Sequence, residues 1–268
     1  MIKAVFIDID ETLTNSQREI TKETQDEIKR CVEKGIKIIL ASGRSRKEAM
    51  DFQEQIGTSP YIISSNGASC YDAIKAKEIY NESLKKEVVK ELLEYSKRNK
   101  YKLKLNYKDK LVLNEASFPD EKDKVKTIEE LEKIIEEEDI VQCVVADSDI
   151  EKMKKFKMFL EENFYDIKIV NESKKLKNPE LKPSKSYYCD IASANVSKGR
   201  AVLAVCKYLN LEKEEIVTIG DGENDVSMFE TTPNSVAMGN ALESIKKQAK
   251  YLTATNDENG VAEVLKKL

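Results

Sequence analysis

The chain has 268 residues, with 45 Lys and Arg against 49 Asp and Glu, a net charge of −4, and no histidine. This length accommodates one or two domains with a buried core. The small net charge excludes a disordered polyanion, and the chain lacks the basic excess that is typical of a nucleic-acid-binding protein. The absence of histidine excludes Ser-His-Asp triads, HExxH metalloenzymes and histidine-ligated zinc or iron, so any metal site must rest on carboxylates and carbonyls, which suit Mg²⁺, Ca²⁺ or Mn²⁺.

Strands and helices alternate at the start of the chain. Apolar runs at residues 4–7, 36–41 and 61–63 predict strands, and amphipathic stretches at residues 21–33 and 45–56 predict helices. This order predicts a doubly wound parallel sheet, in which ligands bind at the carboxyl ends of the strands. A polar cluster follows each strand; the three are Asp8-Ile9-Asp10, Ser42-Gly43-Arg44 and Ser64-Ser65-Asn66-Gly67.

The character of the sequence changes near residue 83. Strict alternation at residues 101–105 predicts a half-exposed antiparallel strand, and Thr127 with Glu130 forms a capping-box pattern at a helix start. The other predicted elements are helices at residues 84–97 and 149–164 and strands at 111–113, 140–146 and 167–170, followed by a Lys-rich loop at 172–185. We expect residues 83–187 to form an α+β domain inserted into the first.

The α/β pattern then resumes. A strand is predicted at residues 187–191, a helix capped by Ser197 at 198–208, strands at 216–219, 235–238 and 251–253, and a helix at 261–268. The predicted fold is therefore an α/β, Rossmann-like core of residues 1–82 and 188–268 with the α+β insertion between them.

The five cysteines form no C-x-x-C pair, and no run approaches the roughly 20 apolar residues of a membrane span. An apolar strand follows Met1 almost at once, unlike a signal peptide. We therefore expect buried thiols in a reducing compartment, a cytoplasmic location, and no membrane or nucleic-acid partner. The sequence does not indicate the oligomeric state.

Four groups of residues could carry chemistry at the predicted sheet edge. They are the paired carboxylates Asp8 and Asp10, the hydroxyl and amides at Ser42-Gly43, Lys198 at a helix start, and the acidic turn from Asp221 to Asp225. Taken alone, each also fits a structural role: a polar strand end, an N-cap, an exposed lysine or an acidic turn. Together, these groups would place two carboxylate clusters, a hydroxyl and a lysine at one edge of the sheet. A divalent metal and a phosphoryl group would complete the charge balance there.

With these residues the chain resembles the haloacid dehalogenase (HAD) superfamily, in particular the Cof-type phosphatases with a large C2-type (IIB) cap. The matching motifs are Asp8-Ile9-Asp10-Glu11-Thr12-Leu13, Ser42-Gly43-Arg44, Ser65-Asn66-Gly67-Ala68, Ser197-Lys198-Gly199, Gly220-Asp221-Gly222-Glu223-Asn224-Asp225, Met238-Gly239-Asn240-Ala241, and residues 255–262. The insertion matches in size and position only. Glu11 departs from the family pattern, which usually has Gly there, and leaves open the local turn and whether this carboxylate touches the metal.

The resemblance implies an Mg²⁺-dependent phosphatase with an aspartyl-phosphate intermediate. Asp8 would attack the phosphorus, and Asp10 would protonate the leaving alcohol and then activate water. It further implies that Asp8, Asp221 and the main-chain carbonyl of Asp10 would hold Mg²⁺, with Asp225 in support. Ser42, the Gly43 amide, Lys198 and Asn224 would bind the phosphate.

The implied substrate is a small phosphomonoester, either a sugar phosphate or a phosphorylated cofactor, with the insertion acting as a lid. Two alternatives stay open. A phosphomutase or phosphotransferase on the same scaffold would share every core motif, and a phospho-ligand sensor or phospho-accepting domain could use similar residues without hydrolysis.

Overall fold

The computed structural model describes residues 1–108, 110–114, 125–173, 176 and 186–268. The chain divides into two compact units, one of residues Met1–Asn81 with Ser197–Leu268 and the other of Glu82–Val196. None of the helices among the described residues is long and apolar enough to cross a membrane. All five cysteines are buried and free, as predicted.

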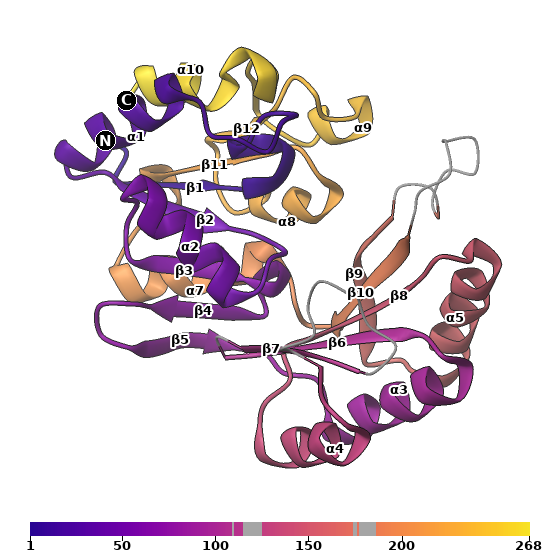
Figure 1. Cartoon of the computed structure of the whole chain (residues 1–268). Helices are drawn as coiled ribbons and strands as arrows, with labels where there is room; N and C mark the ends of the chain where they lie inside the picture. Colours follow the sequence, from indigo (N-terminus) through magenta and orange to yellow (C-terminus); the bar gives the residue numbers. More distant parts are fainter. Residues whose placement is uncertain (109, 115–124, 174–175, 177–185) are drawn as a thin grey trace. The chain divides into compact units, whose positions relative to one another are not determined.

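The first unit is built on an eight-stranded sheet with the order β13-β12-β11-β1-β2-β3-β4-β5 (Figure 1). The strands are β1 (Ala4–Ile7), β2 (Lys37–Ala41), β3 (Tyr61–Ser64), β4 (Ser69–Asp72), β5 (Lys77–Asn81), β11 (Ile216–Gly220), β12 (Ser235–Ala237) and β13 (Tyr251–Leu252). Pairing is parallel from β13 to β3 and antiparallel for β3 with β4 and β4 with β5. The predicted parallel core is confirmed, but the antiparallel extension was not predicted.

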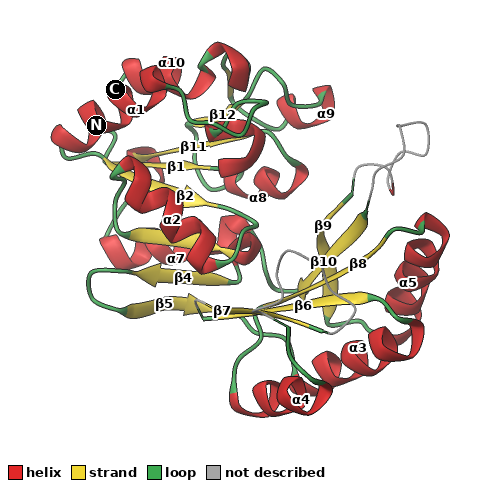
Figure 2. Ribbon diagram, viewed as in Figure 1, coloured by secondary structure: helices red, strands yellow, loops and turns green. Residues whose placement is uncertain are grey.

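Helices cover both faces of this sheet. They are α1 (Lys22–Glu33), α2 (Arg46–Ile56), α7 (Lys198–Leu209), α8 (Val226–Phe229), α9 (Glu243–Lys246) and α10 (Gly260–Lys266) (Figure 2). Successive residues of a strand point to opposite faces, so Val5 and Ile7 of β1 join one apolar cluster, while Phe6 packs with Val202 of α7 in another. Burial on both faces explains why the core strands are mostly apolar.

Strand β1 lies at the point where the chain order of the sheet reverses. Strands β2 and β3 lie on one side of β1, and β11 and β12 lie on the other. In doubly wound sheets a ligand site forms at the carboxyl ends of the strands next to such a reversal. The residues after β11, β1 and β2 are therefore placed at a natural binding edge.

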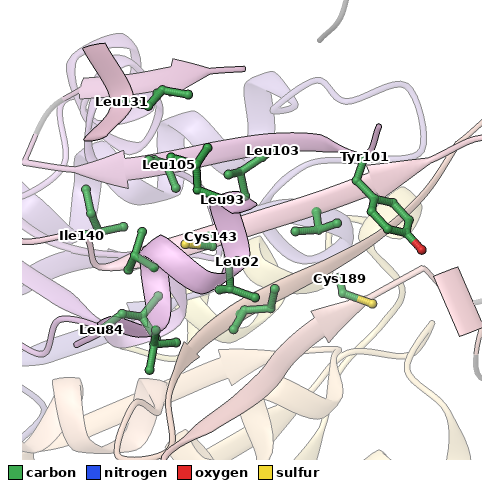
Figure 3. Packing of buried hydrophobic residues seen from close by; sticks show 14 of the residues in the cluster. Leu84, Leu92, Leu93, Tyr101, Leu103, Leu105, Leu131, Ile140, Cys143 and Cys189 are labelled. Atoms are coloured by element: carbon green, nitrogen blue, oxygen red, sulfur yellow. The ribbon is translucent and has the colours of Figure 1, made fainter. Parts of the chain in front are cut away.

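The second unit contains a five-stranded antiparallel sheet with the order β7-β6-β8-β10-β9. Its elements are α3 (Lys86–Asn99), β6 (Lys102–Tyr107), β7 (Lys110–Leu113), α4 (Ile128–Glu137), β8 (Gln142–Asp147), α5 (Ile150–Asn163), β9 (Ile167–Glu172) and β10 (Tyr187–Ser193). Residues of α3, α4 and α5 pack with one face of the sheet in a single apolar cluster that includes Leu92, Leu103 and Cys143 (Figure 3). The predicted α+β character is confirmed, as is the capping box at Thr127 and Glu130.

The boundary predicted at residue 188 is wrong by nine residues. Strand β10 pairs antiparallel with β8 and β9, so it belongs to the second sheet and not to the first. The chain re-enters the first unit at Ser197. The apolar pattern of residues 187–191 shows a strand but not which sheet supplies its partners. Most of the predicted loop at 172–185 lies outside the described residues.

Candidate active site

The site begins with Asp8, the residue that follows β1. Its backbone N–H donates to the carbonyl of Ile219 at 3.0 Å, which holds Asp8 against the end of β11. The side chain is only 9% exposed. The sheet therefore fixes a buried carboxylate at the reversal of strand order.

A buried lysine neutralises this carboxylate. Lys198 opens helix α7 behind an N-cap at Ser197, whose hydroxyl accepts from the Arg200 N–H. Its Nζ donates to Oδ1 of Asp8 at 2.5 Å and to Oδ1 of Asp225 at 2.6 Å, and the side chain is fully buried. Burial alone would lower the pKa of Lys198, but the carboxylates of Asp225 and Asp8 outweigh it and raise that pKa. The ammonium therefore stays charged.

The acidic turn after β11 contributes two more carboxylates. Oδ2 of Asp225 accepts from the N–H groups of Asp221 and Gly222 at 3.0 and 2.9 Å, and Thr12 donates to Oδ1 of Asp221 at 2.8 Å. Position 220 requires glycine because a Cβ there would lie 2.5 Å from the Asp225 carboxyl group. The turn is thus folded around the Asp225 side chain.

The carboxylates of Asp8, Asp221 and Asp225 form one cluster, with one oxygen of each within 4.8 Å of the others. Burial, followed by the Asp225 carboxylate, raises the pKa of Asp221 to about 6. Burial together with the charges of Asp225 and Asp221 also raises the pKa of Asp8, against the opposing effect of Lys198. Three carboxylates facing one ammonium leave surplus negative charge, which fits a hard divalent cation with oxygen ligands.

Asp10 lies outside this cluster. Strand β1 ends at Ile7, and Asp10 lies in the turn Ile9–Leu13 that follows it. Its two carboxylate oxygens accept from Nε and Nη2 of Arg44 at 2.9 and 2.6 Å. The guanidinium also lies over the ring of Phe52. Sequence reasoning gave Arg44 no role, although it ends the neighbouring strand's motif.

Three of the four predicted phosphate-binding residues, Ser42, Gly43 and Asn224, contact Asn66. Ser42 is fully buried, and its Oγ accepts from the Arg44 N–H at 3.1 Å. Nδ2 of Asn224 donates to Oδ1 of Asn66 at 2.9 Å, and the Asn66 side chain packs against Gly43. Asn66 was quoted for the resemblance but not predicted as a site residue; its position after the third core strand was the available signal.

The C-terminal part of the chain holds the turn that follows Asp10. Asn240 donates to the carbonyl of Glu11 at 2.8 Å, and Asn256 donates to the carbonyl of Thr14 at 3.0 Å. The Asn256 N–H in turn donates to Oδ1 of Asn240 at 3.0 Å. Glu11 has φ of 59°, a left-handed conformation that favours glycine, which explains why the family pattern has Gly at this position.

Comparison with known proteins identifies the family. A family model described as haloacid dehalogenase-like hydrolase matches residues 5–265. The chain is 28% identical to phosphatase YwpJ of Bacillus subtilis, over all of both chains. It is 24% identical to the 5-amino-6-(5-phospho-D-ribitylamino)uracil phosphatase YcsE of the same organism, covering 99% of this chain and 95% of YcsE. The crystal structure of TM0651 from Thermotoga maritima superposes with a TM-score of 0.82 at 28% identity, covering 100% of this chain and 98% of that one.

Proposed function

The chain belongs to the haloacid dehalogenase-like hydrolases and acts on phosphoric monoesters, and on that premise we propose that it transfers the phosphoryl group to Asp8 before hydrolysis. The observation that carries this proposal is the buried Asp8 carboxylate, held at 2.5 Å by the fully buried Lys198. A fixed carboxylate beside a permanent positive charge suits nucleophilic attack on a phosphorus atom whose oxygens carry negative charge.

In the first step an Oδ atom of Asp8 forms a bond to phosphorus, and the bond from phosphorus to the ester oxygen breaks. Asp10 donates a proton to the departing alkoxide. In the second step Asp10 takes a proton from water, the water oxygen attacks phosphorus, and the bond to Asp8 breaks. Free phosphate leaves and both carboxyl groups return to their starting states. For the first step Asp10 must be protonated, so we expect its pairing with Arg44 to loosen when substrate binds.

The residues present fit a divalent metal, and we propose Mg²⁺. Asp8, Asp221 and the main-chain carbonyl of Asp10 would hold it, and Asp225 would support them, since both of its oxygens already accept hydrogen bonds. When bound, such an ion supplies positive charge next to the transferring phosphoryl group. Lys198 supplies a second positive charge, which neutralises Asp8 and would bind a phosphate oxygen.

Ser42, the Gly43 amide and Asn224 would bind the remaining phosphate oxygens. Support comes from their convergence: Ser42–Gly43 after β2 and Asn224 after β11 both contact Asn66. Neutral hydroxyl and amide donors orient a phosphate without adding more charge to the site.

We propose a small phosphomonoester as the substrate, either a sugar phosphate or a phosphorylated cofactor, and the second unit, Glu82–Val196, as the part of the chain that selects it. YcsE, which is similar over nearly the whole chain, is named for a phosphorylated ribitylamino-uracil and supports this size and polarity of substrate. A cytoplasmic location remains a prediction.

The test is phosphate release from p-nitrophenyl phosphate by the wild type with Mg²⁺, by the wild type with EDTA, and by Asp8→Asn with Mg²⁺. We expect release only in the first arm. Release by Asp8→Asn would refute Asp8 as the nucleophile, and undiminished release in EDTA would refute the metal. Addition of sugars as acceptors tests the alternative: a new sugar phosphate in place of free phosphate would indicate a phosphotransferase. No turnover in any arm, with a phosphoryl mimic such as beryllium fluoride still bound, would favour the sensor.

A further inference from the structure

The short turn after β3 contacts the ends of other elements that form the site. The Ser65 N–H donates to the Arg44 carbonyl at 2.8 Å, and the Asn66 N–H donates to the Ser42 carbonyl at 3.0 Å. A Cβ at residue 67 would lie 2.4 Å from the Ser197 carbonyl oxygen, so Gly67 packs directly against the start of α7. This turn therefore contacts both the Ser42–Gly43 turn and the N-terminus of the helix that carries Lys198.

The backbone of this turn is strained. Three consecutive residues have left-handed φ values, 50° at Ser65, 58° at Asn66 and 95° at Gly67. Only glycine adopts this region freely, and asparagine tolerates it better than most other residues. Strain of this kind persists where the surrounding structure fixes it, and it is concentrated at functional sites.

The side chain of Asn66 is also costly to bury. The residue is 1% exposed, its Oδ1 accepts from Asn224, and its Nδ2 has no hydrogen-bond partner among the described residues. A buried donor without a partner destabilises a fold, so this amide is not explained by stability. Its two polar atoms lie beside Gly43: a Cβ at residue 43 would be 3.0 Å from Oδ1 and 3.1 Å from Nδ2.

We propose that Asn66 is a positioning residue that holds the Asn224 side chain and the Ser42–Gly43 turn in the geometry that binds phosphate. This inference rests on the proposed function, because it takes Ser42, Gly43 and Asn224 as the phosphate ligands. The strained turn holds the Asn66 carboxamide in contact with both groups of donors. One hydrogen bond then fixes the Asn224 amide, and direct packing fixes Gly43.

The test is a double-mutant cycle of Asn66→Gly and Asn224→Ala. Glycine keeps the left-handed backbone and removes only the side chain. We measure kcat and KM for p-nitrophenyl phosphate with Mg²⁺, and the inhibition constant of inorganic phosphate. Loss of one positioned hydrogen bond corresponds to roughly a tenfold effect, so we expect both KM and the inhibition constant to rise about tenfold in Asn66→Gly. We expect kcat to change less than about threefold.

If Asn66 acts through Asn224, the KM of the double variant is at most about twofold higher than that of the more impaired single variant. The proposal would be overturned if the rise in KM of the double variant equalled the product of the rises in the two single variants. An unchanged KM in Asn66→Gly would also overturn it. Asn66→Ser, whose hydroxyl is too short to reach Asn224, is the second variant should Asn66→Gly fail to fold, and the same rise in KM is expected.

Asn210→Gly is the matched control, because Asn210 also has a left-handed φ, of 52°, but caps the end of α7 outside the site. We expect its KM to match the wild type. The two proposals fail separately: activity in Asp8→Asn refutes the proposed function, whereas an unchanged KM in Asn66→Gly with inactive Asp8→Asn refutes only the role of Asn66.

Discussion

Replacement of Lys198 by methionine tests the charge balance of the site through stability alone. The fully buried ammonium lies 2.5 Å from Oδ1 of Asp8 and 2.6 Å from Oδ1 of Asp225. At an effective dielectric constant of about 20, each contact is worth roughly 6 kcal/mol. Desolvation of the three buried groups offsets much of this, and removal of one partner from such a set typically costs about 3–5 kcal/mol.

We therefore expect Lys198→Met to lower the free energy of unfolding by about 3–5 kcal/mol at pH 8, measured by urea denaturation with circular dichroism. The deficit should shrink toward acidic pH, because a protonated carboxyl group no longer needs a cation. In Lys198→Met/Asp8→Asn one stranded charge is removed, and we expect about 1–2 kcal/mol to return.

Lys207→Met is the matched control, since Lys207 lies exposed in the last turn of the same helix. Its free energy of unfolding should change by less than about 0.5 kcal/mol. A Lys198→Met variant as stable as the wild type would refute the reasoning, as would a double variant less stable than the single one.

Three further predictions concern the turn after Asp10 and the buried thiols. Glu11→Gly relieves the strain of the left-handed φ of 59° but adds backbone freedom to the unfolded chain. Because these effects oppose each other, the free energy of unfolding should stay within about 1 kcal/mol of the wild type. A larger loss in urea denaturation would show that the Glu11 side chain is needed. Asn256→Ala removes the 3.0 Å hydrogen bond to the Thr14 carbonyl, and we expect stability to fall by about 1 kcal/mol and kcat for p-nitrophenyl phosphate to fall severalfold; an unchanged kcat would contradict a role in holding this turn. Burial raises the thiol pKa to about 12 for Cys189 and about 11 for Cys206. The unfolded thiols lose protons first, near pH 8.5, so stability should fall as pH rises from about 8.5 to 11, by up to about 1.4 kcal/mol per pH unit for each thiol; an unfolding free energy that stays constant over this range would refute this.

The parallel core could be predicted because its strands are buried on both faces. Residues 4–7 and 38–41 are apolar throughout, and such runs leave little choice of structure. Strands β4 (Ser69–Asp72) and β5 (Lys77–Asn81) were missed because their residues are mostly polar, and β5 is a partly exposed edge strand. Their pairing is set by the tertiary context and not by local pattern.

The sequence predicted which residues converge at the site better than how each side chain is used. Asp8, Lys198 and Asp225 are distant in sequence, yet the end of β1, the start of α7 and the turn after β11 bring them together. The pair of Arg44 with Asp10 and the bridge from Asn66 to Asn224 depend on side-chain directions in irregular turns. Hydrophobic periodicity gives no information about these directions, so they required the structure.

The most direct test of the central claim uses Asp10→Asn with p-nitrophenyl phosphate and Mg²⁺ in a rapid-mixing experiment. p-Nitrophenolate is a good leaving group that needs little acid assistance, whereas hydrolysis of the intermediate needs the Asp10 base. We predict a burst of about one p-nitrophenolate per enzyme, little phosphate, and a phosphoryl group on Asp8 by mass spectrometry of the acid-quenched protein. Release of p-nitrophenolate and phosphate at equal rates without a burst, or a phosphoryl group on a residue other than Asp8, would contradict the account.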